Sequence, residues 1–161
     1  MNKKYLIICD MQVDVIKKAG QEGLNIINPI VTEVMDGDYG YVFTTWLNGK
    51  DFCIRDTDGW KYCAQIVDAI QNVAISDGVM INCLEKETPL YTNWSSLIRD
   101  PIEITVVGLN GYDSVLINAL ALKSLFPKAK VVVKKSCIAV NCIPSMNLYS
   151  LLTCNGIVVE R

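Results

Sequence analysis

The chain has 161 residues, a length typical of a single domain that can bury a core without disulfides or metal. Hydrophobic residues make up 51%, charged residues 20%, and the formal net charge is −2. Lys and Arg are scattered rather than clustered, which argues against a nucleic-acid partner. We therefore expect one globular domain over residues 1–161.

The N-terminal segment MNKKYLIICDMQ holds two lysines and a short apolar run. The run stops after five residues at Asp10, which is too short for a signal peptide. No other run approaches the ~18 apolar residues of a membrane span. We expect a soluble cytoplasmic protein with no membrane partner.

Cysteine and histidine usage narrows the possible chemistry. The seven cysteines are odd in number and none forms a CxxC pair, so we interpret them as small buried side chains in a reducing compartment. The chain has no histidine. A Ser-His-Asp or Cys-His site within the chain is therefore excluded, as is a metal site that depends on His ligands. We expect no metal and no cofactor.

Continuous apolar runs alternate with segments of helical spacing along the chain. Such runs are typical of strands buried on both faces of a parallel sheet. The strongest helix is predicted where Asp113 is a good N-cap and Pro127 ends the pattern. In chain order the sequence predicts strand 5–9, helix 24–35, strand 41–46, helix 62–73, strand 79–85, strand 102–109, helix 113–126, strand 129–134, helix 144–155 and strand 156–160.

This alternation predicts the α/β class, as a three-layer α/β/α sandwich around a doubly wound, mainly parallel six-stranded sheet. The one long irregular segment is LNGKDFCIRDTDGWK, residues 47–61. Loops of that length in compact domains are often functional.

Ligands of such sheets bind at the carboxyl ends of the strands. Asp10, Lys86 and Ser114 follow three predicted strands there. Asp10 could accept a proton from a nucleophile, Lys86 could stabilise charge, and Ser114 would lie at a helix N-terminus that favours an oxyanion. Each also has a structural interpretation, because Asp and Ser cap turns and helices and a terminal Lys is usually solvated.

Three segments in order, LIICDMQVDV, EKETPLYTNW and VVGLNGYDSV, carry a resemblance over nearly the whole chain. The sequence resembles the isochorismatase-like cysteine hydrolases, which include nicotinamidases and N-carbamoyl amidohydrolases. The resemblance implies the isochorismatase-like fold and hydrolysis of small amides or other C–N bonds. It also implies a catalytic triad of Asp10, Lys86 and position 114, where this chain has Ser and the family has Cys.

The resemblance further implies an oxyanion hole made by the backbone N–H groups of Asn110 and Ser114. In the family this turn follows a cis peptide bond, and the bond at the corresponding place is Leu109–Asn110. A small-molecule substrate or ligand is the expected partner, and homo-oligomers are common in the family.

Several positions depart from the family pattern. Val13 and Val15 replace Asn and Phe, so an aromatic wall of the pocket is missing. Gly111 and Tyr112 stand where many members have Thr-Asp. Residues 44–60 contain no His, so the metal-binding type of nicotinamidase is not expected.

A serine hydroxyl is more difficult to activate as a nucleophile than a cysteine thiol, and the chain lacks the imidazole that serine usually needs. We therefore expect a degenerate enzyme (a pseudoenzyme). Alternatives are Ser-based hydrolysis, a substitute thiol at Cys137 or Cys142, an engineered replacement of Cys at position 114, or a binding or assembly subunit. A nucleotide-binding domain is a weaker rival, because GLNG does not match GxGxxG.

Aromatic side chains on the loops near the predicted site could line a substrate pocket, although such residues are as often packing. The candidates are Trp46, Trp60, Tyr91, Trp94 and Tyr112.

Overall fold

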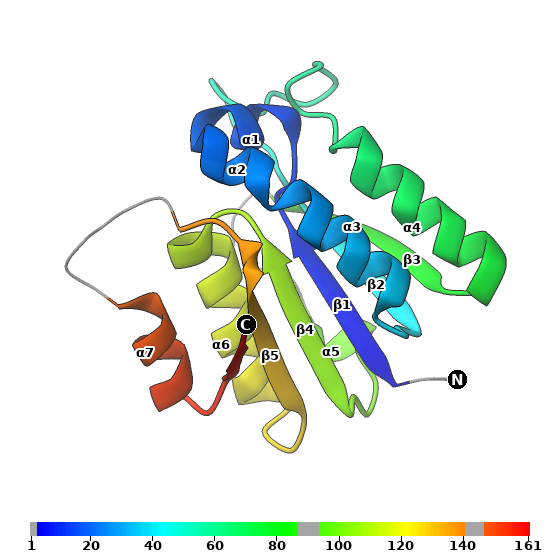
Figure 1. The fold of residues 1–161 in the computed structure, drawn as a ribbon, viewed down its shortest axis with the longest axis vertical. Coiled ribbons are helices and arrows are strands. Elements are labelled where there is room, and N and C mark those ends of the chain that lie inside the picture. Colours follow the sequence, from blue (N-terminus) through cyan, green and yellow to red (C-terminus); the bar gives the residue numbers. More distant parts are fainter. Residues whose placement is uncertain (1–2, 87–93, 141–146) are drawn as a thin grey trace.

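The computed structural model describes residues 3–86, 94–140 and 147–161, except for the side chains of 77 and 82–86. Within these residues, six strands form one all-parallel sheet with the order β3-β2-β1-β4-β5-β6 (Figure 1). The strands are β1 (Lys4–Cys9), β2 (Tyr41–Leu47), β3 (Met80–Lys86), β4 (Glu103–Gly108), β5 (Lys130–Ile138) and β6 (Val158–Glu160).

Helices cover both faces of the sheet, as Figure 1 shows. One layer consists of α1 (Val13–Ala19), α2 (Gln21–Asn25), α3 (Ile27–Asp36) and α4 (Ala64–Asp77). The other consists of α5 (Trp94–Leu97), the π-helical turn η1 (Gly111–Val115), α6 (Leu116–Leu125) and α7 (Leu148–Cys154). The predicted three-layer α/β/α sandwich is confirmed.

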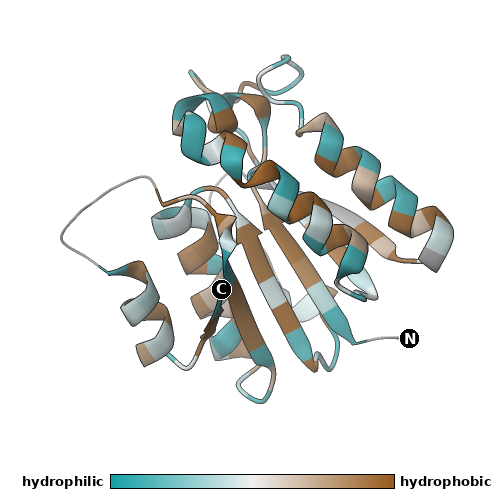
Figure 2. Cartoon of the chain, viewed as in Figure 1, coloured by the Kyte–Doolittle hydropathy of each residue, from teal (hydrophilic) through white to brown (hydrophobic). Residues whose placement is uncertain are grey.

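The core has two halves because successive residues of a strand face opposite sides of the sheet. In β1, Leu6 and Ile8 pack under the α1–α4 layer, whereas Tyr5 and Ile7 pack under the α5–α7 layer. All four are at most 2% exposed. The strands in the middle of the sheet are accordingly largely hydrophobic in Figure 2. Such a strand has no polar face, which explains the continuous apolar runs of the sequence.

Three sequence predictions need correction. The helices α1 and α5 and most of α2 lie where no helix was predicted, and the predicted helix 24–35 is divided between the end of α2 and α3. Strand β5 runs four residues beyond the predicted 129–134, to Ile138. Asp113 is not an N-cap, because the helical turn already begins at Gly111 and the Val115 N–H donates to the Asn110 oxygen over 3.1 Å. The predicted start of helix 144–155 lies outside the described residues.

Among the described residues, no helix has both the length and the apolar character needed to cross a membrane.

Candidate active site

Asp10 and Ser114 meet at the carboxyl ends of two neighbouring strands. Asp10 follows β1 and Ser114 lies in η1, just after β4, and the last residues of these strands are paired. The Ser114 hydroxyl donates a hydrogen bond to Oδ2 of Asp10. Each residue is only 4% exposed. The fold therefore brings together Asp10 and Ser114, two of the three predicted catalytic residues.

Thr45, near the end of β2, completes the surroundings of the carboxylate. Its hydroxyl donates to Oδ1 of Asp10 over 2.7 Å, and its backbone oxygen accepts from the Asp10 N–H over 3.0 Å. Asp10 has a φ of 50°, a left-handed conformation that Asp tolerates better than most residues. Thr45 of β2 and Ser114 of η1 thus fix both oxygens of the buried carboxylate that follows β1.

A glycine allows the turn after β4 to approach β1 closely. Gly108 has a φ of 112°, and a Cβ at this position would collide with the backbone oxygen of Cys9. The next residue, Leu109, donates its N–H to that same oxygen over 2.9 Å. The close approach directs the following turn toward Asp10.

The turn itself has the backbone that the resemblance implies, because the Leu109–Asn110 peptide bond is cis. The Gly111 N–H donates to the Ala139 oxygen over 3.0 Å, which ties the turn to the segment after β5. Asn118 donates from its side-chain amide to the Ser114 backbone oxygen over 2.7 Å. The Ser114 position is therefore held by the side chain of a residue one helical turn later.

Lys86 is the last residue of β3, and its backbone is aligned with Leu47 of β2. It therefore ends a strand that lies two places from β1, at the same edge of the sheet as Asp10. Its side chain lies outside the described residues, as does Tyr91.

A cavity of about 240 Å³ opens beside the Asp10–Ser114 pair. The side-chain oxygen of Asn110, one of the lining residues, is buried and has no hydrogen-bond partner among the described residues. The floor is polar and the walls are largely apolar, as in many small-molecule sites. The lining residues are Asp10, Val15, Lys18, Leu47, Phe52, Leu109, Asn110, Asp113 and Ser114.

The described aromatic candidates lie elsewhere. Trp94 is 2% exposed and packs edge-on against Phe43 in the core, with ring centroids 5.8 Å apart. Trp46 and Trp60 pack on each other at 4.5 Å. None of them lines this cavity, because each indole is used in packing.

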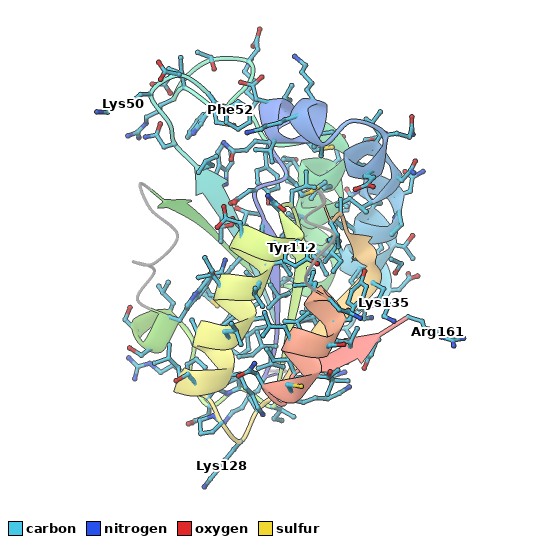
Figure 3. The ribbon with its side chains drawn as sticks, turned by 90° about the vertical axis from the view of Figure 1, so that its left-hand side faces the viewer. Lys50, Phe52, Tyr112, Lys128, Lys135 and Arg161 are labelled. Atoms are coloured by element: carbon cyan, nitrogen blue, oxygen red, sulfur yellow. The ribbon has the colours of Figure 1, made fainter. Side chains whose placement is uncertain are left out.

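Tyr112 also lies away from the cavity. Its hydroxyl accepts the Leu148 N–H over 3.3 Å, at the start of α7. Figure 3 shows Tyr112 on the side of the molecule where α6 and α7 lie, and Phe52 on the loop beyond the ends of the strands. Tyr112 therefore joins η1 to α7 rather than lining the described cavity.

Two residues of the site are not predicted from the sequence: Phe52, and Gln12, which holds the loop of Phe52. Gln12 is fully buried, accepts from the Leu47 N–H over 2.7 Å, and donates to the oxygens of Leu47 and Trp60, each over 2.9 Å. It thereby joins both ends of the long loop after β2. The available signals were the loop's length and a glutamine beside Asp10 in the quoted segment LIICDMQVDV.

The buried thiols are poor substitutes for a nucleophile at position 114. Cys137 is 2% exposed, and burial raises its pKa. Burial, followed by the nearby charge of Asp14, raises the pKa of Cys53 to about 11. Such thiols stay protonated at neutral pH. Cys142 lies outside the described residues.

Metal ligands are also absent from the described part of the chain, in which no three His, Cys, Asp or Glu side chains form a group that could hold an ion.

Comparisons with known proteins give the fold a name. No protein-family model matches the sequence, and no curated protein matches it. Among solved structures, the nicotinamidase of Staphylococcus aureus superposes with a TM-score of 0.79 at 20% identity, over 100% of this chain and 99% of that one. The chain has the isochorismatase-like hydrolase fold.

Other structures with this fold agree. N-carbamoylsarcosine amidase of Thermoplasma acidophilum gives a TM-score of 0.76 at 18% identity and covers 100% of this chain and 96% of its own. The L. infantum protein PnC1, in complex with nicotinate, gives 0.77 at 16% identity and covers 98% and 92%. Similarity at this level establishes the isochorismatase-like fold. The chemistry has to be argued from the residues of the site.

Proposed function

We propose that the protein binds a small amide in the cavity beside Ser114 and is a degenerate amidohydrolase, or pseudoenzyme. The observation that carries the proposal is the buried hydrogen bond from Ser114 to Asp10 at the wall of a small cavity. In this proposal the pair is a nucleophile and its proton acceptor, with serine at the position where the family resemblance implies cysteine. The similar structures include nicotinamidases and an N-carbamoylsarcosine amidase, whose names indicate small amides.

In this proposal Asp10 accepts the proton of the residue at position 114. Lys86, at the end of β3, supplies a positive charge to the same site. The backbone N–H groups of Asn110 and Ser114 receive the oxyanion that forms when the amide carbon is attacked.

Serine limits the chemistry for a physical reason. A thiol with a pKa near ~8.5 loses its proton easily, whereas a serine hydroxyl normally needs a neutral imidazole or amine as its base. The chain has no histidine, and a lysine that shares a site with the Asp10 carboxylate, as this proposal has Lys86 do, is held in its charged form. We therefore expect the amide to be bound but hydrolysed slowly or not at all.

The test is ammonia release from a panel of small amides and N-carbamoyl compounds, with Ser114→Cys compared with the natural protein. In the variant, the thiolate attacks the amide carbon, ammonia leaves, and water then releases the acid from the thioester. Turnover by the variant alone supports the proposal. Asp10→Asn in the Ser114→Cys background is the control, and it should abolish this turnover.

The second candidate is an active serine amidohydrolase. It is favoured by the direct Ser114–Asp10 hydrogen bond, which polarises the hydroxyl. Turnover by the natural protein that is lost in Ser114→Ala would establish it. A protein in which neither serine nor cysteine gives turnover, and to which no amide of the panel binds, contradicts both candidates.

We also propose a cytoplasmic homo-oligomer, as the family resemblance implies. Ile75 and Ile102 are large apolar side chains at the surface, 86% and 64% exposed, and are positions that an interface could cover. Mass measurement in solution by light scattering tests the oligomeric state. A monomer at all concentrations would contradict it.

A further inference from the structure

We propose that the ligand of this cavity carries an anionic group, and that Lys18 is the specificity-determining residue that receives it. The inference rests on the proposed binding of a small amide and adds to it the charge of the ligand and its orientation.

Lys18 is a cation at the cavity wall. It lies in the last turn of α1, and its ammonium group is 5.0 Å from the centroid of the Phe52 ring. Among the described residues it forms no ion pair with a carboxylate. The contact with the ring lowers the freedom of a long side chain, so an ion pair with a ligand costs less conformational entropy.

Phe52 is held in place by the contacts of its loop. The Gln12 hydrogen bonds to Leu47 and Trp60 hold the two ends of the loop, and the Cys53 N–H lies 3.4 Å from a carboxylate oxygen of Asp14. The Asp14 N–H in turn donates to the Gly59 oxygen over 2.9 Å. The ring and the ammonium above it therefore form a built wall of the cavity.

This wall also answers a departure noted in the sequence. Val15 stands where the family has Phe, which suggested that an aromatic wall was missing. In the structure both Val15 and Phe52 line the cavity. The loop thus brings an aromatic ring from another part of the chain, and the ring lies against the Lys18 ammonium group of α1.

The other charges of the cavity orient the ligand. The Asp10 oxygens already accept hydrogen bonds from Ser114 and Thr45. The carboxylate has no hydrogen to donate to an anionic ligand, and its charge would repel one. The proposed function already places the amide at the backbone N–H groups of Asn110 and Ser114, two residues that line the same cavity. The amide end therefore lies at Asn110 and Ser114, and the anionic end lies at Lys18.

Asp113 is an exposed carboxylate that also lines the cavity and faces the same solvent. It would repel an anion placed near η1 and favour one placed at α1. A cationic amide would instead be drawn to Asp113 and Asp10, and that possibility is an outcome of the test.

The experiment measures binding of three matched probes to the full-length natural protein by titration calorimetry: benzamide, its meta-carboxylate derivative and its meta-aminomethyl derivative. We expect the meta-carboxylate probe to bind about fivefold more tightly than benzamide, which is the gain expected from one partly exposed charge pair between the probe and Lys18. Lys18→Gln should remove the preference, and Lys18→Glu should reverse it toward the aminomethyl probe. Lys17→Gln is the matched control, because this neighbouring lysine is exposed and does not line the cavity, and it should retain the preference.

Equal binding of all three probes, or an equal effect of Lys17→Gln and Lys18→Gln, would overturn the role of Lys18 and leave the amide site standing. Tighter binding of the aminomethyl probe would show that the carboxylates of Asp10 and Asp113, rather than Lys18, decide the selectivity. If none of the probes binds, the amide site itself is wrong and this inference fails with it.

Discussion

The side-chain amide of Asn118 donates a hydrogen bond to the backbone oxygen of Ser114 over 2.7 Å. The oxygen of the same side chain accepts from the Trp94 indole N–H over 3.2 Å. Asn118 is only 1% exposed. One buried amide therefore joins α5 to the turn that presents the Ser114 hydroxyl to Asp10.

Replacing Asn118 with Leu should destabilise the fold and disturb Ser114. The change leaves the Trp94 N–H and the Ser114 oxygen buried with one partner fewer, which costs roughly 2–4 kcal/mol in the free energy of unfolding. Urea denaturation measures this cost, and Asn72→Leu on the exposed side of α4 is the control. In the Ser114→Cys background, Asn118→Leu should also change how the alkylation rate of the introduced thiol depends on pH. A merely structural role of Asn118 would not produce this effect.

Replacing Gln12 with Ala should release the loop between β2 and α4. The variant loses the hydrogen bonds to Leu47 and Trp60, at roughly 1 kcal/mol each. Trypsin should then cut the loop faster at Lys50 and Arg55. Gln65→Ala, at an exposed position on α4, should digest like the natural protein. Unchanged cleavage in Gln12→Ala would show that other contacts hold the loop.

Trp94 and Phe52 should behave in opposite ways when each is replaced by Ala. Trp94→Ala removes a buried ring that packs on Phe43 and should cost roughly 3–5 kcal/mol of stability. Phe52→Ala changes a half-buried loop residue at the cavity, so it should weaken binding of the carboxylated benzamide with little change in the urea midpoint. The reverse pattern would place the ligand beside Trp94.

Stability should fall at alkaline pH, and Cys53 should contribute to the fall. Burial and the charge of Asp14 raise its pKa from 9.0 to about 11 in the folded protein. Between these values the folded chain binds more protons than the unfolded chain, so the stabilising contribution is full below pH 9.0 and is lost as the pH rises toward about 11.

Urea midpoints measured across this range test the alkaline effect. Cys53→Ala should flatten the profile, whereas Cys154→Ala, at an exposed position, should not. Burial also raises the pKa of Cys137, so some alkaline loss should remain in Cys53→Ala. A profile that is the same with and without Cys53 would contradict the prediction.

The sheet and the meeting of Asp10 with Ser114 could be predicted from the sequence. Strands buried on both faces leave continuous apolar runs, and parallel strands bring their carboxyl ends to one edge. The cis bond before Asn110 was implied only by the family resemblance and is confirmed.

The cavity wall could not be predicted, because it depends on contacts between distant segments. The position of Phe52 depends on Gln12 and Asp14, which meet the loop only in the folded chain. Trp94 is a candidate for either the pocket or the core in the sequence, because a loop aromatic and a packing aromatic look alike there, and the structure places it in the core. Asp113 has the residue type of a cap, but the turn starts earlier because Asn110 accepts the hydrogen bond that closes it.

The first strand of the chain is the centre of the sheet. β1 pairs with β2 on one side and β4 on the other, and the latter pairing joins residues about a hundred positions apart. During synthesis, β1 therefore leaves the ribosome with apolar side chains and with one edge of unpaired N–H and C=O groups that waits until β4 has emerged. Asp10 cannot meet Ser114 before that moment, so a ribosome stalled before β4 carries a nascent chain that is prone to aggregation and has no site.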